Sequence, residues 1–250
     1  MRAEKRTVVF SDAHLETSPE GRETVDALAA QIRKWQKDGV QRIFVLGDLF
    51  DFWFEYRHVI FSGYFPVLRA FAEARDAGVE FHLVCGNHDF WAGRFLETEL
   101  GFHVYSDPEI MLFGAKRVWF AHGDGLNVGD YGYRIYKRIA RSRFAITLFR
   151  QLHPDRAMGL ARWVSRGSRH MTLVEDPSQG SEAKALRVHA QQMLATGKAD
   201  VVLMGHAHAA IREECPTPGG TGLYVNCGDW RRNRSYVIWD GEDFELVAEG

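Results

Sequence analysis

The chain has 250 residues, of which 46% are hydrophobic and 26% charged, and its formal net charge is −2. A chain of this length can bury a full core in one domain, and a net charge so close to zero gives no overall reason to expect a nucleic-acid partner. Three scattered cysteines exclude a disulfide framework, and no run of about 18 to 20 apolar residues is present to span a bilayer. We therefore expect a single domain over residues 1–250 in a cytoplasmic protein without a signal segment.

Short β-rich runs alternate with helical patterns in the first part of the chain, as in βαβ units. Gly78 is the expected stop of the second helix. The expected elements are a strand at 7–10, a helix at about 23–37, a strand at 42–46, a helix near 64–77 and a strand at 81–85.

After Gly101 the pattern changes to closely spaced strands, with a hairpin turn at Gly114–Ala115. A loop is expected at Pro216, Pro218, Gly219 and Gly220. The predicted strands lie at 103–105, 109–113, 117–121, 200–204, 209–213, 222–226, 235–239 and 244–247. Together with the first part, they predict an α/β fold with two sheets in a sandwich.

Residues 130–197 carry helical patterns without strands, and we interpret this stretch as a helical cap inserted into the sandwich. Residues 131–170 hold ten lysines and arginines against one acid, which is Asp155, so this part is basic while the rest of the chain is acidic. Apolar residues recur between these charges at helical spacing. The insertion is therefore expected to form a basic amphipathic cap that attracts an anionic substrate and the anionic inner face of the cytoplasmic membrane.

Five short polar blocks each follow an apolar run directly. They supply carboxylate, amide and imidazole groups, which are ligands for divalent transition metals. The blocks are Asp12–His14, Gly47–Asp51, Gly86–Asp89, His122–Asp124 and Gly205–His208. Because ligands collect at the carboxyl ends of strands in α/β sheets, we expect these blocks to converge on a site for two metal ions. Asp48 is the expected bridging carboxylate, and the two-residue spacing of His206 and His208 points both rings to one side of an extended segment.

These five blocks resemble those of the calcineurin-like metallophosphoesterase superfamily. The resemblance implies a four-layer α-β-β-α sandwich and a dinuclear metal centre. It implies that Asp12, His14, Asp48 and His208 hold the first ion, and that Asp48, Asn87, His122 and His206 hold the second. We expect two divalent ions. The mixed carboxylate, amide and imidazole ligands, without a thiolate, suit Mn²⁺, Fe²⁺ or Zn²⁺ better than Mg²⁺, and we favour Mn²⁺.

Within the superfamily, the segments 47–53, 86–91 and 122–124 and the basic insertion are similar to the UDP-2,3-diacylglucosamine diphosphatases of lipid A synthesis. Better-known members of that group often carry Arg where this chain has His88, and a related branch keeps His. The resemblance implies an anionic, lipid-linked nucleotide substrate. The expected substrate contacts are Asp130, Tyr133, Arg166, Ser168 and Arg169.

The expected reaction is in-line attack on phosphorus by a hydroxide that bridges the two metals. His88 would stabilise charge on the phosphoryl oxygens, and Asp89 would orient the His88 ring. We interpret Asp51 as a supporting or helix-capping residue and not as a metal ligand.

Other functions remain open from the sequence alone. One is a phosphodiesterase or phosphatase for another nucleotide or lipid phosphate, and another is an inert membrane or scaffold module, although none of the seven expected ligands is missing. A nuclease is less favoured because the body of the chain is acidic, and no obligate protein partner is expected. The aromatic run at residues 50–56 could wall a lipid pocket or pack beneath the site.

Overall fold

Two facing β-sheets form the centre of the fold. The computed structural model describes residues 4–126, 131–160 and 176–248. The first sheet has the strand order β11-β10-β1-β2-β3-β4, in which β1 to β4 run parallel and β10 pairs antiparallel with β1. Its strands are β1 (Thr7–Phe10), β2 (Arg42–Leu46), β3 (Glu80–Val84), β4 (Phe102–Tyr105), β10 (Tyr236–Trp239) and β11 (Phe244–Val247).

The second sheet has the order β5-β6-β7-β9-β8, with parallel pairing of β6, β7 and β9. Its strands are β5 (Glu109–Phe113), β6 (Lys116–Ala121), β7 (Val201–Met204), β8 (Ala210–Thr217) and β9 (Gly220–Cys227). The loop expected around Pro216 to Gly220 is shorter than predicted, because β8 continues through Pro216 and pairs with β9. Since β8 is the edge strand of this sheet, the missing N–H of a proline is tolerated there.

Alternating apolar side chains hold the layers together, because successive residues of a strand point to opposite faces. In β2, Ile43 and Val45 pack toward the helices, whereas Phe44 and Leu46 pack against the other sheet. The strands β6 and β7 follow the same rule, with one set of side chains between the sheets and the other set facing α7 (Ser181–Ala195). Strands that are buried on both faces read as continuous apolar runs, which is why they could be predicted from the sequence.

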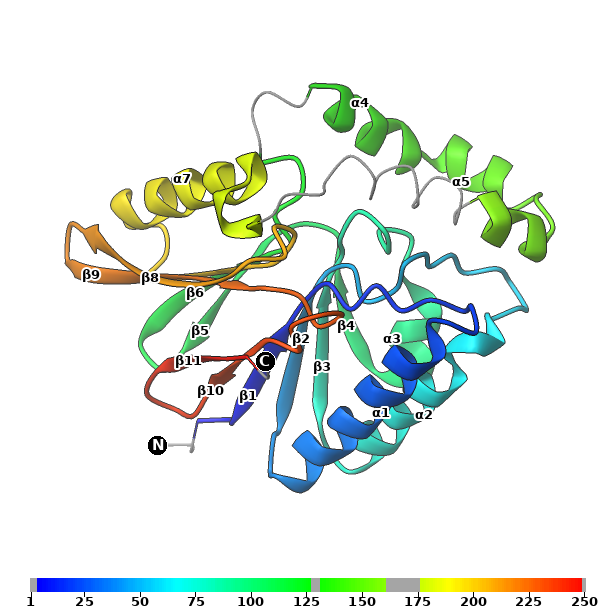
Figure 1. The fold of residues 1–250 in the computed structure, drawn as a ribbon, viewed down its shortest axis with the longest axis horizontal. Helices are drawn as coiled ribbons and strands as arrows, with labels where there is room; N and C mark the ends of the chain where they lie inside the picture. The colour runs from blue at the N-terminus through cyan, green and yellow to red at the C-terminus, as the bar shows by residue number, and fades with distance from the viewer. Residues whose placement is uncertain (1–3, 127–130, 161–175, 249–250) are drawn as a thin grey trace.

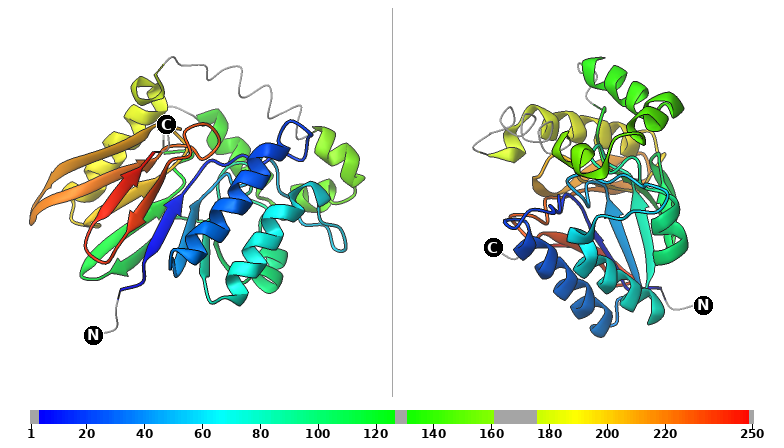
Figure 2. Two further views of the ribbon diagram at one scale, coloured as in Figure 1. Left: turned by 60° about the horizontal axis from the view of Figure 1, so that its bottom comes forward. Right: turned by 90° about the vertical axis from the view of Figure 1, so that its right-hand side faces the viewer.

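Helices cover the outer face of each sheet and complete the four-layer sandwich (Figures 1 and 2). On the first sheet lie α1 (Arg22–Lys37), α2 (Phe65–Asp76) and α3 (Arg94–Leu100), with a 3₁₀ turn at Ser62–Tyr64 before α2. The sequence reading missed α3, since a helix of seven residues with two buried side chains shows too little periodicity to be recognised. Its end is marked by Gly101 in the left-handed conformation, with a φ of 70°.

The predicted insertion contains two kinds of helix. The helices α4 (Tyr131–Ala140) and α5 (Arg143–Phe149) stand above the loops that follow the strands (Figure 1). By contrast, α7, which follows a 3₁₀ turn at Pro177–Gln179, packs on the second sheet through Leu186, Ala190 and Leu194. Within the described ranges, no helix has the length and apolar character needed to cross a membrane.

Aromatic side chains join α5 to the body of the protein. In the predicted aromatic run, Phe50 and Trp53 belong to the core between the first sheet and the helices that cover it. Phe52 and Phe54 instead contact Phe149 of α5, at ring-centroid distances of 5.6 and 4.9 Å. The run therefore packs in two directions and docks α5 beside the polar blocks.

Candidate metal centre

The five polar blocks meet at one edge of the two sheets, where the strands end. Asp12 and His14 follow β1, Asp48 follows β2, and Asn87 follows β3. From the second sheet, His122 follows β6, and His206 and His208 follow β7. Because these parallel strands end at the same edge, the sheets bring together side chains that lie almost 200 residues apart.

Five of these residues have an unusual backbone conformation. Asp12, His14, Asp48, His206 and His208 have φ angles of 55°, 41°, 52°, 66° and 53°, in the left-handed region. A non-glycine residue held there costs about 1–2 kcal/mol, and such residues cluster at functional sites. Backbone hydrogen bonds between the loops after β1 and β2 fix part of this geometry, with Asp12 N donating to Gly47 O at 3.1 Å and His14 N donating to Asp48 O at 2.8 Å.

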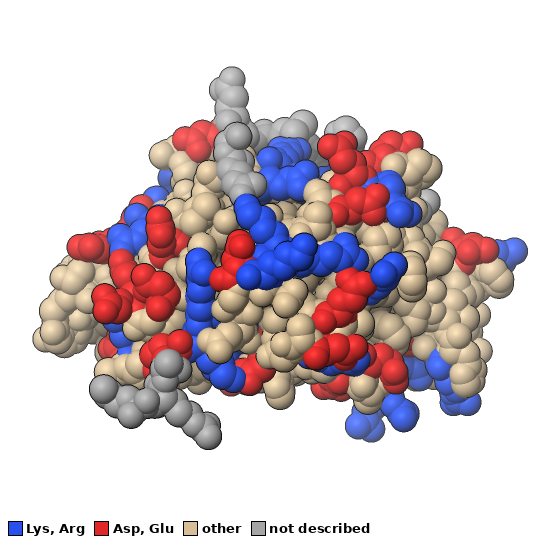
Figure 3. Space-filling model, turned by 90° about the horizontal axis from the view of Figure 1, so that it is seen from below, with Lys and Arg blue, Asp and Glu red and all other residues tan. Residues whose placement is uncertain are grey.

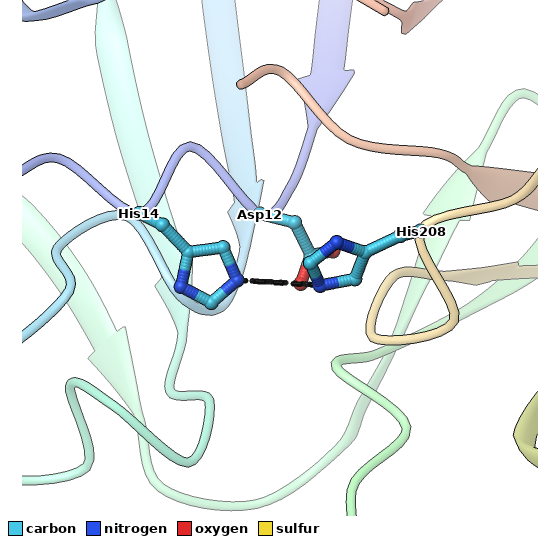
Figure 4. Close-up of side chains that lie close together, drawn as sticks. All are labelled: Asp12, His14 and His208. Atoms are coloured by element: carbon cyan, nitrogen blue, oxygen red, sulfur yellow. Dashed lines mark hydrogen bonds and ion pairs between the residues drawn. The ribbon is translucent and has the colours of Figure 1, made fainter. Parts of the chain in front are cut away.

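Asp12, His14 and His208 form the first cluster (Figure 4). The two Nε2 atoms of His14 and His208 lie 3.3 Å apart, and Nε2 of His208 lies 3.3 Å from Oδ1 of Asp12. Oδ2 of Asp12 accepts the backbone N–H of His206, whereas the buried Oδ1 has no hydrogen-bond partner. Imidazole nitrogens of His208 and His14 are thus the polar atoms that face this buried oxygen, and a carboxylate oxygen grouped with two imidazole nitrogens fits a divalent cation.

Asp48, His122, His206 and the amide of Asn87 form the second cluster. Nε2 of His122 lies 3.0 Å from Asn87 Oδ1, 3.1 Å from His206 Nδ1 and 3.3 Å from Asp48 Oδ2. The other ring nitrogen of His122 faces the carbonyl of Leu46 at 2.7 Å. Because a carbonyl only accepts, Nδ1 of a neutral His122 carries the proton and Nε2 presents its lone pair to the cluster.

Asp48 lies between the two clusters. Its Oδ2 is 3.3 Å from His122 and 3.7 Å from His14, which belong to different clusters. Its Oδ1 accepts the backbone N–H of His88 at 2.9 Å, which holds the carboxylate in this orientation. A carboxylate in this position is suited to contact two cations at once.

The local electrostatics favour negative carboxylates. Burial alone would raise the pKa of Asp48 and of Asp12, but the surrounding imidazoles lower both pKa values below the usual range. Burial alone would lower the pKa of His122, but the neighbouring carboxylates raise it well above that of a free histidine. Burial lowers the pKa of His14 and of His206. The centre therefore combines ionised carboxylates with imidazoles, and this donor set fits divalent cations of the first transition row.

The surroundings of His88 differ from the prediction. Its Nδ1 lies 2.8 Å from the backbone carbonyl of Asp51, so this carbonyl, and not Asp89, orients the ring. The buried carboxylate of Asp89 instead accepts the backbone N–H groups of Gly86 and Leu49, each at 2.8 Å. Burial and the nearby Asp48 raise the pKa of Asp89 to about 6. Asp89 thus braces the loops after β2 and β3, since both of its oxygens are used by the backbone.

Of the predicted substrate contacts, Tyr133 lies beside the centre, where its hydroxyl donates to Asp124 at 2.6 Å. The remaining four, Asp130, Arg166, Ser168 and Arg169, fall outside the described residues.

Two supporting residues were missed from the sequence. The buried amide of Asn226 donates to the carbonyl of Gly205 at 2.7 Å and accepts the N–H of Gly228 at 3.1 Å, which fixes the loop before His206. Asp229 has an oxygen 3.9 Å from Nδ1 of His208. Asn226 lies at the end of β9 and Asp229 follows that strand. Polar residues that follow an apolar run therefore marked this place in the sequence, as they did in the five blocks.

The chain resembles known proteins over most of its length. Residues 5–210 match the sequence model of the calcineurin-like phosphoesterase family. A protein of Porphyromonas gingivalis named UDP-2,3-diacylglucosamine hydrolase is 32% identical over 257 residues, covering 95% of this chain and 95% of that protein. A protein of the same name from Aeromonas salmonicida is 28% identical, covering 93% of this chain and 89% of its own length. The solved structure of a phosphoesterase from E. coli aligns with a TM-score of 0.45 and 15% identity, over 97% of this chain and 92% of that one. The range matched by the family model contains all seven side chains of the two clusters.

Proposed function

Because the chain belongs to the calcineurin-like phosphoesterase family and is thus a hydrolase of phosphoric ester or pyrophosphate bonds, we propose that its substrate is UDP-2,3-diacylglucosamine. Hydrolysis of the pyrophosphate would release UMP and 2,3-diacylglucosamine 1-phosphate. The observation that carries this proposal is the 32% identity, across 95% of both chains, to a hydrolase named for that substrate. The clusters around Asp48 support the proposal, because their carboxylates and imidazoles would bind the metal ions that such a reaction needs.

Seven side chains are proposed to hold two divalent ions, with Mn²⁺ favoured. Asp12, His14, Asp48 and His208 would bind one ion, and Asp48, Asn87, His122 and His206 would bind the other. The unpartnered oxygen of Asp12 and the position of His122 Nε2, which faces Asn87, His206 and Asp48, support this assignment. When bound, such a pair of ions activates water near neutral pH and neutralises charge on the phosphate.

His88 is proposed to act on the phosphoryl oxygens. The carbonyl of Asp51 accepts from Nδ1, so Nε2 is the ring atom left to face the reacting group, and it lies 4.0 Å from Oδ2 of Asp48. A proton held at Nε2 would let the ring donate to a phosphoryl oxygen as negative charge develops there. Asp89 has an indirect role in this scheme, since it positions the backbone on either side of the centre.

Incubation of the purified protein and Mn²⁺ with UDP-2,3-diacylglucosamine, followed by mass spectrometry of the products, tests the proposal. Release of UMP is expected from the wild type and from His103→Gln, whose ring lies outside both clusters. Asp48→Asn should abolish the release, and His88→Ala should slow it by about 100-fold. Absence of UMP with the wild type would refute the substrate assignment, and a His88→Ala rate within twofold of wild type would refute the role of His88.

The helices α4 and α5 are proposed to place the protein on the inner face of the cytoplasmic membrane. Ile135, Ile139, Phe144 and Leu148 on these helices are 60–79% exposed, between arginines and lysines. Cationic helices with exposed apolar side chains bind anionic bilayer surfaces. On the lower face of the molecule, away from these helices, positive and negative side chains are interspersed (Figure 3).

Co-sedimentation with vesicles that contain anionic lipid tests this attachment. Phe144→Ser combined with Leu148→Ser should weaken vesicle binding about tenfold, because two apolar side chains no longer enter the bilayer. Leu112→Ser is the matched control, since Leu112 is 69% exposed but lies on β5. Equal binding by the double variant and the control would argue against membrane docking through α5.

A further inference from the structure

A cavity of about 700 Å³ lies between α4 and the ends of the strands, next to the candidate metal centre. Its inner wall is formed by the end of β3 at Cys85 and by His122 to Asp124 after β6. The turn between β4 and β5 at Ser106 to Pro108 closes one side, and α4 forms the outer wall. Because His122 borders both the cavity and the second cluster, a ligand in this space would reach the centre.

The outer wall is fixed to the body at several points. The buried carboxylate of Asp124 accepts the hydroxyl of Tyr133 at 2.6 Å and pairs with Nζ of Lys137 at 2.7 Å. At the end of α4, the carbonyl of Ala140 accepts from Nε1 of Trp91 at 3.0 Å, and Arg141 donates to the carbonyl of Ser106 at 3.0 Å. These contacts hold α4 at a fixed position over the cavity.

Positive charge along the wall of the cavity is only partly compensated. Four cationic and two acidic side chains line it. Lys137 pairs with Asp124, and Arg141 donates to the carbonyl of Ser106 and lies 4.0 Å from the carboxylate of Asp107. Arg134 and Arg138 form no ion pair or hydrogen bond with another residue in the part of the chain that the structure describes. They stand four positions apart on α4, so they lie on one face of the helix and can act on the same anion.

We propose that this cavity is a phosphate subsite, which holds the phosphate monoester group of one product beside the metal centre through Arg134 and Arg138. Guanidinium groups bind phosphate oxygens with two parallel hydrogen bonds, and the volume is within the range of small-molecule sites. The identity of the monoester rests on the proposed function. Hydrolysis of the pyrophosphate yields one monoester on a nucleoside and one on a sugar, and both present the same chemistry to the arginines.

Calorimetric titration of the manganese-loaded protein with UMP and, separately, with glucosamine 1-phosphate tests the subsite. In Arg134→Gln combined with Arg138→Gln, the affinity for one of the two monoesters should fall at least tenfold, because charge-assisted hydrogen bonds are lost. A loss confined to UMP assigns the subsite to the nucleotide half, and a loss confined to glucosamine 1-phosphate assigns it to the sugar half. Arg143→Gln combined with Arg150→Gln is the matched control, because it removes the same charge from α5 and the residue that follows it, outside the cavity.

Two outcomes would overturn the subsite. One is that both affinities stay within twofold of wild type in the α4 double variant. The other is that they fall equally in the α5 control, which would reveal a general effect of charge. Hydrolysis of UDP-2,3-diacylglucosamine by the wild type is measured in parallel. Failure of that reaction would refute the proposed substrate, whereas the titrations decide on the cavity independently.

Discussion

Gly86 lies so close to Asp48 that one added methyl group would disturb the candidate metal centre. A Cβ at this position would stand 2.1 Å from Oδ1 of Asp48 and 2.6 Å from its backbone nitrogen, although contacts below 3.0 Å are essentially never adopted. Gly86→Ala must therefore move the carboxylate or the loop after β3 by about 1 Å, in a packed interior that offers little free space.

The expected cost follows from the contacts that such a shift breaks. Oδ1 of Asp48 accepts the N–H of His88, and losing a hydrogen bond to a charged group costs about 1.5–3 kcal/mol. Overpacking adds about 1–3 kcal/mol, so we expect a loss of about 3–5 kcal/mol in the free energy of unfolding. For a chain of this size the melting temperature should fall by about 10 °C. A displacement of about 1 Å at a reacting centre should lower kcat/KM by about 100-fold.

The matched control is Gly219→Ala, because an added Cβ there meets nothing within 4 Å and the φ angle is not left-handed in either glycine. Differential scanning calorimetry and steady-state rates are compared for the two variants and the wild type, at saturating Mn²⁺. If Gly86→Ala matched Gly219→Ala in both melting temperature and kcat/KM, the inferred contact between the loop after β3 and Asp48 would be wrong.

Three further predictions concern stability. Burial lowers the pKa of His82 from 6.5 to about 4, so only the unfolded chain binds this proton between those pH values. The free energy of unfolding should then fall by up to about 3 kcal/mol as the pH drops from 6.5 to 4. In urea unfolding, His82→Phe should no longer show this decrease with pH. A pH profile of the variant equal to that of the wild type would exclude the effect. Asn226→Ala leaves the N–H of Gly228 without its partner and leaves the carbonyl of Gly205 with the N–H of Ala207 as its remaining donor. The variant should cost about 2–4 kcal/mol in urea unfolding, whereas a cost below 1 kcal/mol would contradict the bracing role. Removal of metal by a chelator should lower the melting temperature by the equivalent of about 3–4 kcal/mol, and Mn²⁺ should restore it; a melting temperature that does not respond would argue against the metal centre.

The sequence could predict the strands and the polar blocks because both are local patterns. In β2, the residues on both faces of the strand are apolar, so the sequence shows a continuous apolar run directly before Gly47. The residue types in the blocks, read at the ends of such runs, were sufficient to predict which side chains would gather. Short elements such as α3 were missed, since seven residues give too few turns of a helix to show a period.

The sequence by itself therefore determined the fold class and the types of side chain that gather at the site. The apolar pattern of a strand is visible in its own residues, and the donor atoms of a metal ligand follow from its residue type. Only the tertiary structure decided that the Asp51 carbonyl orients His88 and that Asp89 braces the backbone. It alone placed α7 on the second sheet and α4 over a basic cavity closed by Asp124. These features depend on distances between residues far apart in the chain, and backbone carbonyls and N–H groups, which every residue carries, leave no mark in the sequence.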